Sequence, residues 1–323
     1  MSVLLGKKIK LFALSSNIEL AKEIADSIGV GLSEVEVKHF QDGEINVDIS
    51  ETVRGHHIFV IQPLSYPVND HLMELLIMCD ALKRASAKTI NLVIPYYGYS
   101  RQDRKVKSRQ PISAKLVADL IQVAGANRVI CMDIHATQIQ GFFNIPVDNF
   151  LGLPILCDYL LQKNLKDVVI VSPDHGGLKR AREFAKVFNC PIAIIDKRRP
   201  EPNKAEVMNL IGNVENKTCI IVDDMVDTAG TLTVGAKALL DAGAKEIYAA
   251  CTHGVLSGPA IERVQNSPLK ELIITNTIKQ PENKCIDKIK ILSVGKLLGN
   301  GIIRILEDEP LSDLFAYHYE EER

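Results

Sequence analysis

Residues 220–231 read Ile-Ile-Val-Asp-Asp-Met-Val-Asp-Thr-Ala-Gly-Thr, and this stretch carries more structural information than any other part of the chain. The β-branched run Ile220–Val222 is too short for a helix and predicts a buried strand. The adjacent carboxylates of Asp223 and Asp224 follow it, at the edge where open α/β sheets bind ligands. Since a helical pattern begins at Leu232, the stretch predicts a strand–loop–helix unit whose loop faces a ligand.

The loop combines two kinds of ligand chemistry. Residues 227–231 are small or hydroxyl-bearing, and the backbone N–H groups and positive dipole at a helix start suit a phosphate dianion. Asp223 and Asp224 cannot hold phosphate, but they can accept hydrogen bonds from hydroxyls or coordinate a metal. A ligand with a phosphate and vicinal hydroxyls, such as ribose 5-phosphate, matches both halves. The alternative is that the carboxylates merely end a strand and that Thr231 caps a helix.

The composition of the chain limits its class and its partners. A length of 323 residues is natural for two domains of about 150 residues each. A formal charge of −2 gives no overall attraction to nucleic acid or to an anionic membrane. No uninterrupted apolar run approaches the ~20 residues of a membrane span. The 7 scattered cysteines favour free thiols in a reducing cytosol, so we expect a soluble cytoplasmic protein with no nucleic-acid or membrane partner.

Apolar, β-branched runs alternate with helical patterns along the chain. Near-continuous apolar strands between helices predict parallel sheets that are covered by helices on both faces. The predicted strands lie at 9–14, 58–62, 90–95, 128–132, 168–172, 192–195, 219–222, 247–251 and 272–275.

The same alternation indicates two similar α/β halves. They meet around 149–153 without a Gly/Ser-rich or Pro-rich linker, so the predicted domains are residues 1–149 and 150–323. A weak internal repeat agrees with this division, because a His twice follows a helix-ending Gly at the same spacing. The two pairs are Gly125 with His135 and Gly243 with His253.

Two clusters of basic residues each follow a predicted strand. Residues 101–109 contain five Lys and Arg side chains, and Lys197, Arg198 and Arg199 follow the strand at 192–195. The clusters could be solvated loops, and the first could be a nucleic-acid patch. Their position beyond strand ends favours contacts with polyphosphate oxygens instead. Phosphoryl transfer needs such charge, often on a loop that closes.

Candidate metal ligands follow two other strands. Asp174 lies in the stretch Ser-Pro-Asp-His-Gly-Gly at 172–177 and offers the hard oxygen that Mg²⁺ prefers. His135 follows the strand at 128–132, where a His is more often structural than a ligand. Asp42-Gly43-Glu44 predicts a turn between strands with exposed carboxylates.

In combination these segments resemble class I ribose-phosphate pyrophosphokinases, the 5-phosphoribosyl 1-diphosphate (PRPP) synthetases. The similarity runs from Ile9 to Phe315, whereas phosphoribosyltransferases share only the loop at 223–231 and are typically one such domain. The segments that carry the resemblance are 42–44, 101–103, 138–143, 197–200 and 223–231.

The resemblance implies a fold and an activity. The fold is α/β, with two similar phosphoribosyltransferase-like domains, each a mainly parallel sheet flanked by helices. The enzyme would be a homo-oligomer, a hexamer in this family, that uses Mg²⁺. It would transfer the β,γ-diphosphoryl group of ATP to the 1-hydroxyl of ribose 5-phosphate, giving PRPP and AMP for nucleotide biosynthesis.

The resemblance also assigns roles to residues by matching position. The positions that would bind ribose 5-phosphate are Asp223, Asp224, Asp227, Thr228, Ala229, Gly230 and Thr231. ATP falls to Asp42, Gly43, Glu44, Arg101, Gln102 and Asp103, with the two acidic residues of the turn reaching in from a neighbouring subunit. The metal falls to His135 and Asp174, and catalysis falls to Lys197 and Arg199.

The chain departs from the family pattern at the regulatory phosphate site. Thr52 replaces a Ser and keeps a hydroxyl, whereas Pro310 replaces a Ser and offers neither a hydroxyl nor a backbone N–H. Near the C-terminus, Gly299 and Gly301 stand at helical positions where glycine is costly. The regulatory residues that the chain keeps are Arg54, Ala85, Ser86, Ser312 and Phe315.

Two other functions remain open at this point. A phosphoribosyltransferase would consume PRPP, but this reading leaves both basic clusters and half of the chain unexplained. A non-catalytic regulatory homologue of the synthetase would show degenerate loops, whereas the loop at 223–231 and the metal and catalytic positions are intact.

Overall fold

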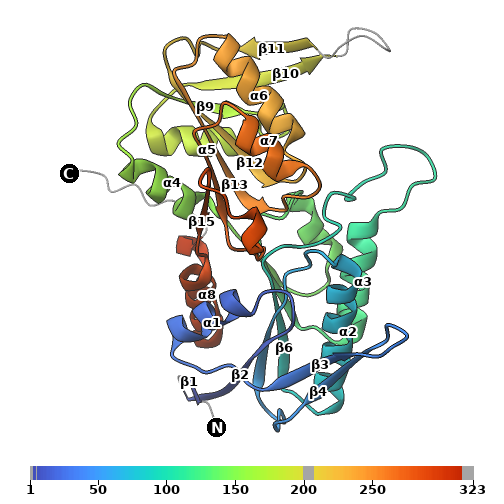
Figure 1. Cartoon of the computed structure of the whole chain (residues 1–323). Coiled ribbons are helices and arrows are strands. Elements are labelled where there is room, and N and C mark those ends of the chain that lie inside the picture. The colour runs from blue at the N-terminus through green and yellow to red at the C-terminus, as the bar shows by residue number, and fades with distance from the viewer. Residues whose placement is uncertain (1–2, 5, 199–206, 315–323) are drawn as a thin grey trace. The chain divides into compact units, whose positions relative to one another are not determined.

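The computed structural model describes residues 3–4, 6–198 and 207–314, which form two compact units (Figure 1). The first unit contains Met1–Leu151, Thr277–Lys279 and the segment that starts at Ser293. The second contains Gly152–Asn276 and Gln280–Leu292. Within the described residues, no helix is both long and apolar enough to cross a membrane.

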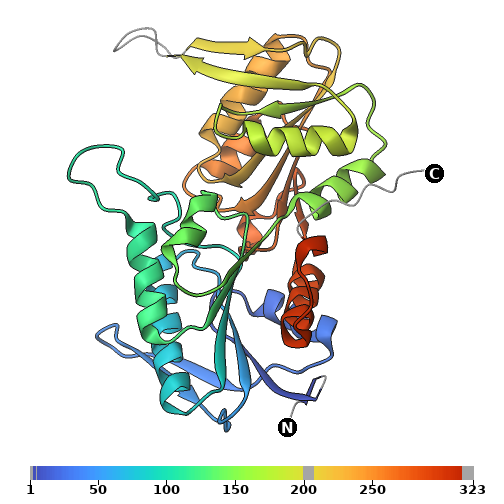
Figure 2. The same ribbon diagram turned by 180° about the vertical axis from the view of Figure 1, so that it is seen from behind.

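The first unit is a six-stranded sheet with helices on both faces. Its strands are β1 (Val3–Leu4), β2 (Lys7–Ala13), β5 (His57–Ile61), β6 (Thr89–Ile94), β7 (Arg128–Met132) and β8 (Val147–Phe150). Its helices are α1 (Ile18–Ile28), α2 (Val68–Arg84), α3 (Ser113–Ala124) and α8 (Gly295–Glu307). The strand order is β1-β2-β5-β6-β7-β8, and all pairs are parallel except β1 with β2. Figures 1 and 2 show α2 and α3 on one face and α1 and α8 on the other.

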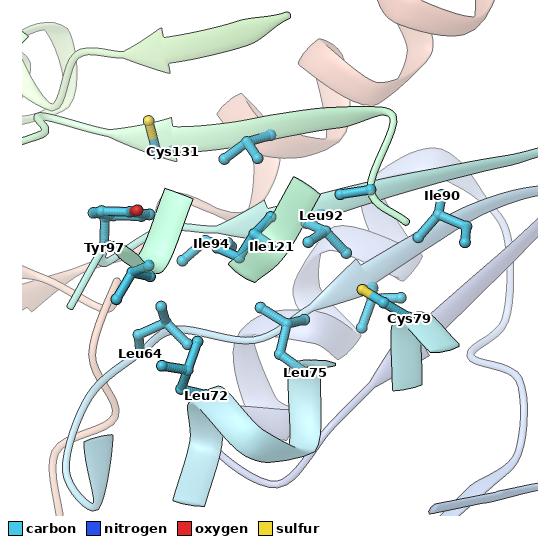
Figure 3. Close-up of a cluster of buried hydrophobic side chains, with 14 of the residues drawn as sticks. Leu64, Leu72, Leu75, Cys79, Ile90, Leu92, Ile94, Tyr97, Ile121 and Cys131 are labelled. Atoms are coloured by element: carbon cyan, nitrogen blue, oxygen red, sulfur yellow. The ribbon is translucent and has the colours of Figure 1, made fainter. Parts of the chain in front are cut away.

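The core of the first unit lies between its sheet and helices α2 and α3 (Figure 3). Alternate residues of the strands, such as Ile90, Leu92 and Ile94, point into this layer and pack against Leu75 and Ile121 of the helices. The residues between them, such as Phe59 and Val93, are also buried, and burial on both faces explains why the strands read as continuous apolar runs. All 7 cysteines of the chain are free, as the sequence predicted.

The second unit is a seven-stranded sheet. Its strands are β9 (Val168–Ser172), β10 (Ile192–Arg198), β11 (Val207–Ile211), β12 (Thr218–Val226), β13 (Glu246–Gly254), β14 (Glu271–Thr275) and β15 (Ile289–Leu292). Its helices are α4 (Leu153–Gln162), α5 (Leu178–Phe188), α6 (Gly230–Asp241) and α7 (Ala260–Asn266). The strand order is β11-β10-β9-β12-β13-β14-β15, with β11 alone antiparallel to its neighbour. Ile220 of β12 packs toward α4 and α5, and Ile221 packs toward α6 and α7.

The two units repeat one succession of elements. In each, a strand and a helix precede an antiparallel hairpin, and a strand, helix, strand, helix and two further strands follow. The hairpin of the first unit, β3 (Val35–His39) with β4 (Ile45–Ile49), therefore corresponds to β10 with β11, and β5 corresponds to β12. The predicted α/β fold with two similar halves is confirmed, and all nine predicted strands are present. The weak repeat of Gly and His was coincidental, because β7 before His135 corresponds to β14, whereas His253 lies on β13.

Helix α8 belongs to the first unit, although the predicted boundary after residue 149 would place it in the second. A Cβ atom on Gly299 would lie 1.9 Å from Oγ of Ser27 in α1, and one on Gly301 would lie 2.5 Å from Cζ of Phe150. Glycine at these positions therefore lets α8 approach α1 and Phe150 closely, which accounts for two residues that weaken an isolated helix.

We expect Gly301→Ala to lower the free energy of unfolding by about 1–3 kcal/mol, because the new methyl group overpacks the buried ring of Phe150. Helix propensity alone would raise it by ~1 kcal/mol. Asn300→Ala, at an exposed position of the same helix, is the matched control and should be neutral or stabilising. Thermal unfolding of both variants decides the question, since equal stabilisation would show that α8 can shift at no cost.

Candidate active site

Strand β12 runs past the end of one of its neighbours. It pairs with β9 as far as Ile221 but with β13 as far as Val226, so the strand is longer than the predicted run that ends at Val222. Asp223 and Asp224 consequently lie on a part of β12 that has a neighbour on one side only. Open α/β sheets bind ligands at strand ends of this kind, where two parallel neighbours no longer pair.

The segment after β12 leads directly into helix α6. Ala229 has φ of 58°, a left-handed conformation that is uncommon for a residue with a side chain, and α6 begins at Gly230. Ala229 is the N-cap residue of α6, and its side chain makes no capping hydrogen bond. A helix whose N-cap residue has no capping side chain can direct its first N–H groups to an anion, which is the geometry that the phosphate-loop hypothesis requires.

The loop is held by the segment that follows β13. The Ser257 hydroxyl donates to Oδ1 of Asp227, and the Ser257 backbone N–H donates to the Asp227 carbonyl at 3.1 Å. Nη1 of Arg263 donates to the Thr228 carbonyl at 2.9 Å. A Cβ atom on Gly230 would lie 3.2 Å from this Nη1, so glycine lets the guanidinium approach the loop. Ser257 and Arg263 were not foreseen, because no local pattern marks a contact that spans about thirty residues.

The acidic pair faces an arginine that the sequence analysis did not single out. Nη1 of Arg180, in the first turn of α5, lies 3.4 Å from Oδ1 of Asp223 and 3.6 Å from Oδ1 of Asp224. The Asp224 side chain is 6% exposed and the Asp223 side chain is 32% exposed. Burial and the neighbouring Asp224 raise the pKa of Asp223 to about 7, although Arg180 opposes this shift. The two carboxylates are therefore close enough for each to oppose the ionisation of the other.

Asp174 lies in the loop after β9, which neighbours β12 in the sheet. Its exposed carboxylate accepts a hydrogen bond from the Gly177 backbone N–H at 2.8 Å, and its carbonyl accepts one from the Ser172 hydroxyl at 2.7 Å. Nε2 of His175, the next residue, lies 3.1 Å from Oδ1 of Asp196 on β10. The ends of β9, β10 and β12 are thus held at one edge of the second sheet.

The basic cluster after Ile195 is partly strand. β10 continues to Arg198 and pairs with β11, so the predicted loop at 196–199 begins later than expected. The backbone of Lys197 is opposite Met208 in this pairing. Arg199 lies outside the described residues.

The first unit brings another predicted group together at its own sheet edge. Arg101, Gln102 and Asp103 follow β6, and His135 follows β7, the parallel neighbour of β6. Nε2 of Gln138, in the 3-10 helix η1 (Thr137–Phe142), donates to Oδ2 of Asp103 at 2.6 Å and ties the two loops to each other. Arg101, Gln102 and His135 are exposed.

Asp42, Gly43 and Glu44 form the exposed tip of the hairpin β3–β4. Gly43 has φ of 92°, and the Glu44 backbone N–H donates to Oδ1 of Asp42 at 3.1 Å. The tip is therefore a tight turn that needs its glycine. It belongs to a two-stranded sheet of its own, separate from the strand ends that carry Arg101 and His135.

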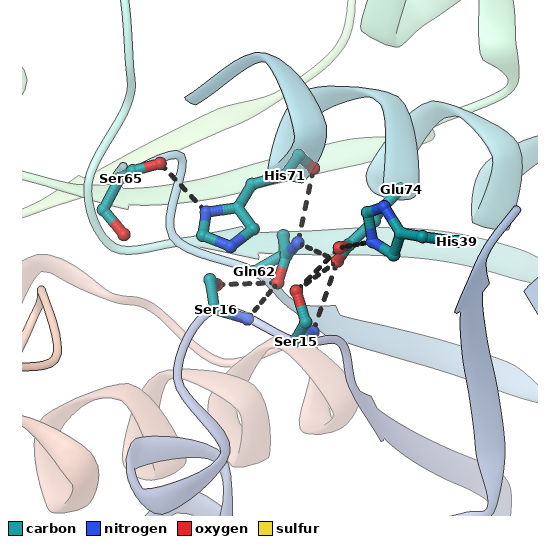
Figure 4. A network of polar contacts seen from close by, with 7 residues as sticks. All are labelled: Ser15, Ser16, His39, Gln62, Ser65, His71 and Glu74. Carbon is teal, nitrogen blue, oxygen red and sulfur yellow. Dashed lines mark hydrogen bonds and ion pairs between the residues drawn. The ribbon is translucent and has the colours of Figure 1, made fainter. Parts of the chain in front are cut away.

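At the strand end that corresponds to the end of β12, the first unit carries a buried polar network (Figure 4). Glu74 of α2 is 1% exposed, and the Ser15 hydroxyl donates to its carboxylate, with Oγ at 2.7 and 2.6 Å from the two oxygens. Nε2 of Gln62, directly after β5, donates to Glu74 at 2.8 Å, while Oε1 of Gln62 accepts from the Ser16 hydroxyl at 2.6 Å. Nε2 of His39 lies 3.5 Å from Glu74. The place beside this strand end is therefore filled by side chains of the chain itself, which hydrogen-bond to one another.

The predicted regulatory residues are partly assembled. Nη1 of Arg54 donates to the Ser86 hydroxyl at 2.9 Å, and Ala85 directly follows α2 beside them. Thr52 is exposed two residues before Arg54, and Ser312 is exposed in the 3-10 helix η3 (Ser312–Leu314). The Pro310 carbonyl accepts a hydrogen bond from Nη1 of Arg304 at 2.8 Å. Phe315 lies outside the described residues.

The donors for a metal are spread over the two units. Among the described residues, no group of three or more His, Cys, Asp or Glu side chains is close enough to hold a metal ion. Mg²⁺ is usually held by one or two carboxylates together with substrate phosphates and waters. The exposed carboxylate of Asp174 fits such a site by its hard oxygen donors, whereas the nitrogen of His135 is a softer donor.

Comparisons with known proteins agree with this arrangement. Residues 9–125 match the N-terminal domain of ribose phosphate pyrophosphokinase, and residues 199–316 match the phosphoribosyl synthetase-associated domain. The chain is 62% identical over 311 residues to a ribose-phosphate pyrophosphokinase of Bacillus cereus, covering 96% of this chain and 98% of the relative. It is 61% identical over 310 residues to the Bacillus subtilis protein of the same name, with the same shares covered.

A solved structure extends the similarity to the fold. The crystal structure of the phosphoribosylpyrophosphate synthetase from Mycobacterium smegmatis matches with a TM-score of 0.89 and 42% identity, over 94% of this chain and 100% of that chain. The agreement of sequence, fold and topology over nearly the full length leaves one conclusion. The chain belongs to the ribose-phosphate pyrophosphokinase family.

Proposed function

We propose that the protein transfers the β,γ-diphosphoryl group of ATP to the 1-hydroxyl of ribose 5-phosphate, forming PRPP and AMP for nucleotide biosynthesis. One observation carries the proposal: a pair of carboxylates and the start of helix α6 lie at the two ends of one short segment, between Asp223 and Gly230. Membership in the family supports the same reaction. We assign the carboxylates to the ribose hydroxyls and the start of α6 to the 5-phosphate.

The transfer needs positive charge near the phosphoryl oxygens, and it does not need a side chain that forms a covalent intermediate. The 1-hydroxyl oxygen bonds to the β-phosphorus, the bond from that phosphorus to the α,β-bridging oxygen breaks, and AMP leaves with this oxygen. The hydroxyl proton goes to solvent. Negative charge spreads over the oxygens of the transferred group, so we assign Lys197 and Arg199 to its stabilisation.

The nucleotide and the metal complete the site. We assign ATP to Arg101, Gln102 and Asp103 together with the hairpin tip at 42–44, and Mg²⁺ to His135 and Asp174. Bound Mg²⁺ would neutralise and orient the polyphosphate of ATP.

We also propose that the protein is a cytoplasmic homo-oligomer, a hexamer in its family, in which Asp42 and Glu44 serve the site of a neighbouring subunit. Inorganic phosphate would bind at Arg54 and Ser86, whose side chains are already joined. Ser312 and Phe315 would complete that site, as they do in the family pattern. Sedimentation of the purified protein tests the assembly.

Assaying AMP formation from ATP and ribose 5-phosphate tests the proposed reaction. A phosphoribosyltransferase would instead consume PRPP and release diphosphate, with no AMP from ATP. A non-catalytic homologue would do neither, while still joining the active enzyme in mixed oligomers. Either result would replace the proposed function.

The assignment of the carboxylates predicts discrimination against a missing hydroxyl. We expect 2-deoxyribose 5-phosphate to be used less efficiently by on the order of 10²-fold or more, because a carboxylate acceptor then stays unpaired. Asp224→Asn should raise the KM for ribose 5-phosphate and narrow the gap between the two sugars. Steady-state kinetics with both sugars measures this, with Asp241→Asn, an exposed aspartate of α6, as the matched control. If the wild type uses the two sugars with equal efficiency, the assignment of Asp223 and Asp224 to the ribose hydroxyls is wrong.

The assignment of Lys197 predicts a loss of turnover with little loss of binding. Removal of one preorganised donor to developing charge costs roughly 3–4 kcal/mol in other enzymes, so Lys197→Ala should lower kcat by about 10²- to 10³-fold. The KM for ribose 5-phosphate should change little, because the sugar is held elsewhere. Lys186→Ala, which removes an exposed lysine of α5, is the control. A kcat close to that of the wild type would remove Lys197 from the mechanism.

A further inference from the structure

Arg180 occupies a place that no role in the proposed reaction explains. It lies in the first turn of α5, and its guanidinium faces both carboxylates of the pair, at 3.4 Å from Asp223 and 3.6 Å from Asp224. The Arg180 side chain is 24% exposed, so part of its hydration is replaced by these contacts. Helix α5 packs on β9, β10 and β12, which fixes the position from which Arg180 reaches the pair.

The pair needs a cation because its own members oppose each other. Burial and the Asp224 carboxylate raise the pKa of Asp223 to about 7, which means that near neutral pH the pair tends to retain a proton. Cys251, opposite Asp223 on β13, supplies no charge, since burial raises the pKa of its thiol well above the ordinary value. Arg180 is the group whose charge lowers the pKa of Asp223.

The contacts between Arg180 and the two carboxylates are long. Distances of 3.4 and 3.6 Å are longer than those of a tight bidentate salt bridge, so the attraction is mainly that of charge. The Asp224 backbone N–H and Arg180 both approach Asp223 at Oδ1, at 2.9 and 3.4 Å. Both of these contacts are made with the same carboxylate oxygen.

We propose that Arg180 is a positioning residue, which keeps Asp223 and Asp224 ionised and oriented so that both accept hydrogen bonds from the vicinal hydroxyls of the sugar. The inference rests on the proposed function, because it takes the sugar phosphate as the ligand. Arg180 acts through the carboxylates and does not itself contact the reacting atoms. Its effect is therefore greatest at the pH at which Asp223 gains its proton.

Substitution of Arg180 tests the inference through binding as well as activity. Arg180→Gln removes the charge, Arg180→Lys restores it, and Lys179→Gln removes an exposed charge from the same helical turn as the matched control. Calorimetric titration with ribose 5-phosphate alone, and kcat/KM for the sugar in the presence of ATP, are both measured from pH 6 to pH 9 (about the range in which the pair titrates).

Arg180→Gln should weaken ribose 5-phosphate binding by about tenfold near pH 6.5 and less near pH 8.5. The direction follows from the sign of the shift: without the guanidinium the pKa of Asp223 rises further, so the carboxylate forms only at higher pH. The acid limb of the profile should move up by about one pH unit. In Arg180→Lys the acid limb should lie close to its wild-type position, and the pH profile of Lys179→Gln should match that of the wild type. The KM for ATP should not change in any of the variants. The phosphate group of the sugar also titrates in this pH range. Its contribution is the same for the wild type and for every variant, so it does not affect the difference between their profiles.

Several results would overturn the inference. A pH-independent loss of binding in Arg180→Gln, unrelieved by Arg180→Lys, would give Arg180 a purely structural role, and thermal unfolding would show the matching loss of stability. A profile identical to that of the wild type would remove any role. If the wild type binds ribose 5-phosphate but forms no AMP, the proposed reaction is wrong. The calorimetric comparison of the variants still tests the role of Arg180 in that case. If the wild type does not bind ribose 5-phosphate, the inference falls with the ligand.

Discussion

Two adjacent carboxylates at the end of a central strand are the constraint around which the second unit is arranged. Like charges this close resist ionisation, and Asp224 is almost fully buried, so the surroundings must supply compensation. The sheet does so by letting β9 part from β12 after Ile221 and by placing the first turn of α5 beside the pair. The neighbouring loop is then fixed by Ser257 and Arg263, so the acidic pair and the helix start keep a set spacing.

The strand–loop–helix stretch from Ile220 was predictable because its information is local: a β-branched run, two carboxylates, and small residues before a helix. Arg180, Ser257 and Arg263 were not, because each reaches the site from about thirty to forty residues away along the chain and sits in an ordinary helical or loop pattern. The strand ends were also misjudged, since polar residues such as Asp223 and Lys197 continue β12 and β10 as backbone even though their side chains break the apolar run.

The two units show how one succession of elements can serve different ends. After β12 the chain carries two carboxylates and the start of α6, whereas after β5 it fills the equivalent place with Gln62, Glu74 and their serine partners. The first unit instead gathers its exposed polar residues after β6 and β7, where Gln138 joins Asp103. The two similar folds therefore carry their candidate binding residues on different strand ends, which a search for sequence repeats could not detect.

Helix α8 has a consequence for how the protein is made. The first unit contains residues up to Leu151, yet one of the two helices on its second face is formed from Gly295–Glu307. During synthesis the side of α1 on which α8 packs, including Ser27 and Ile28, stays without this cover until residues 295–307 have been made. The second unit can complete its sheet before that moment, so the unit encoded first is the one finished last.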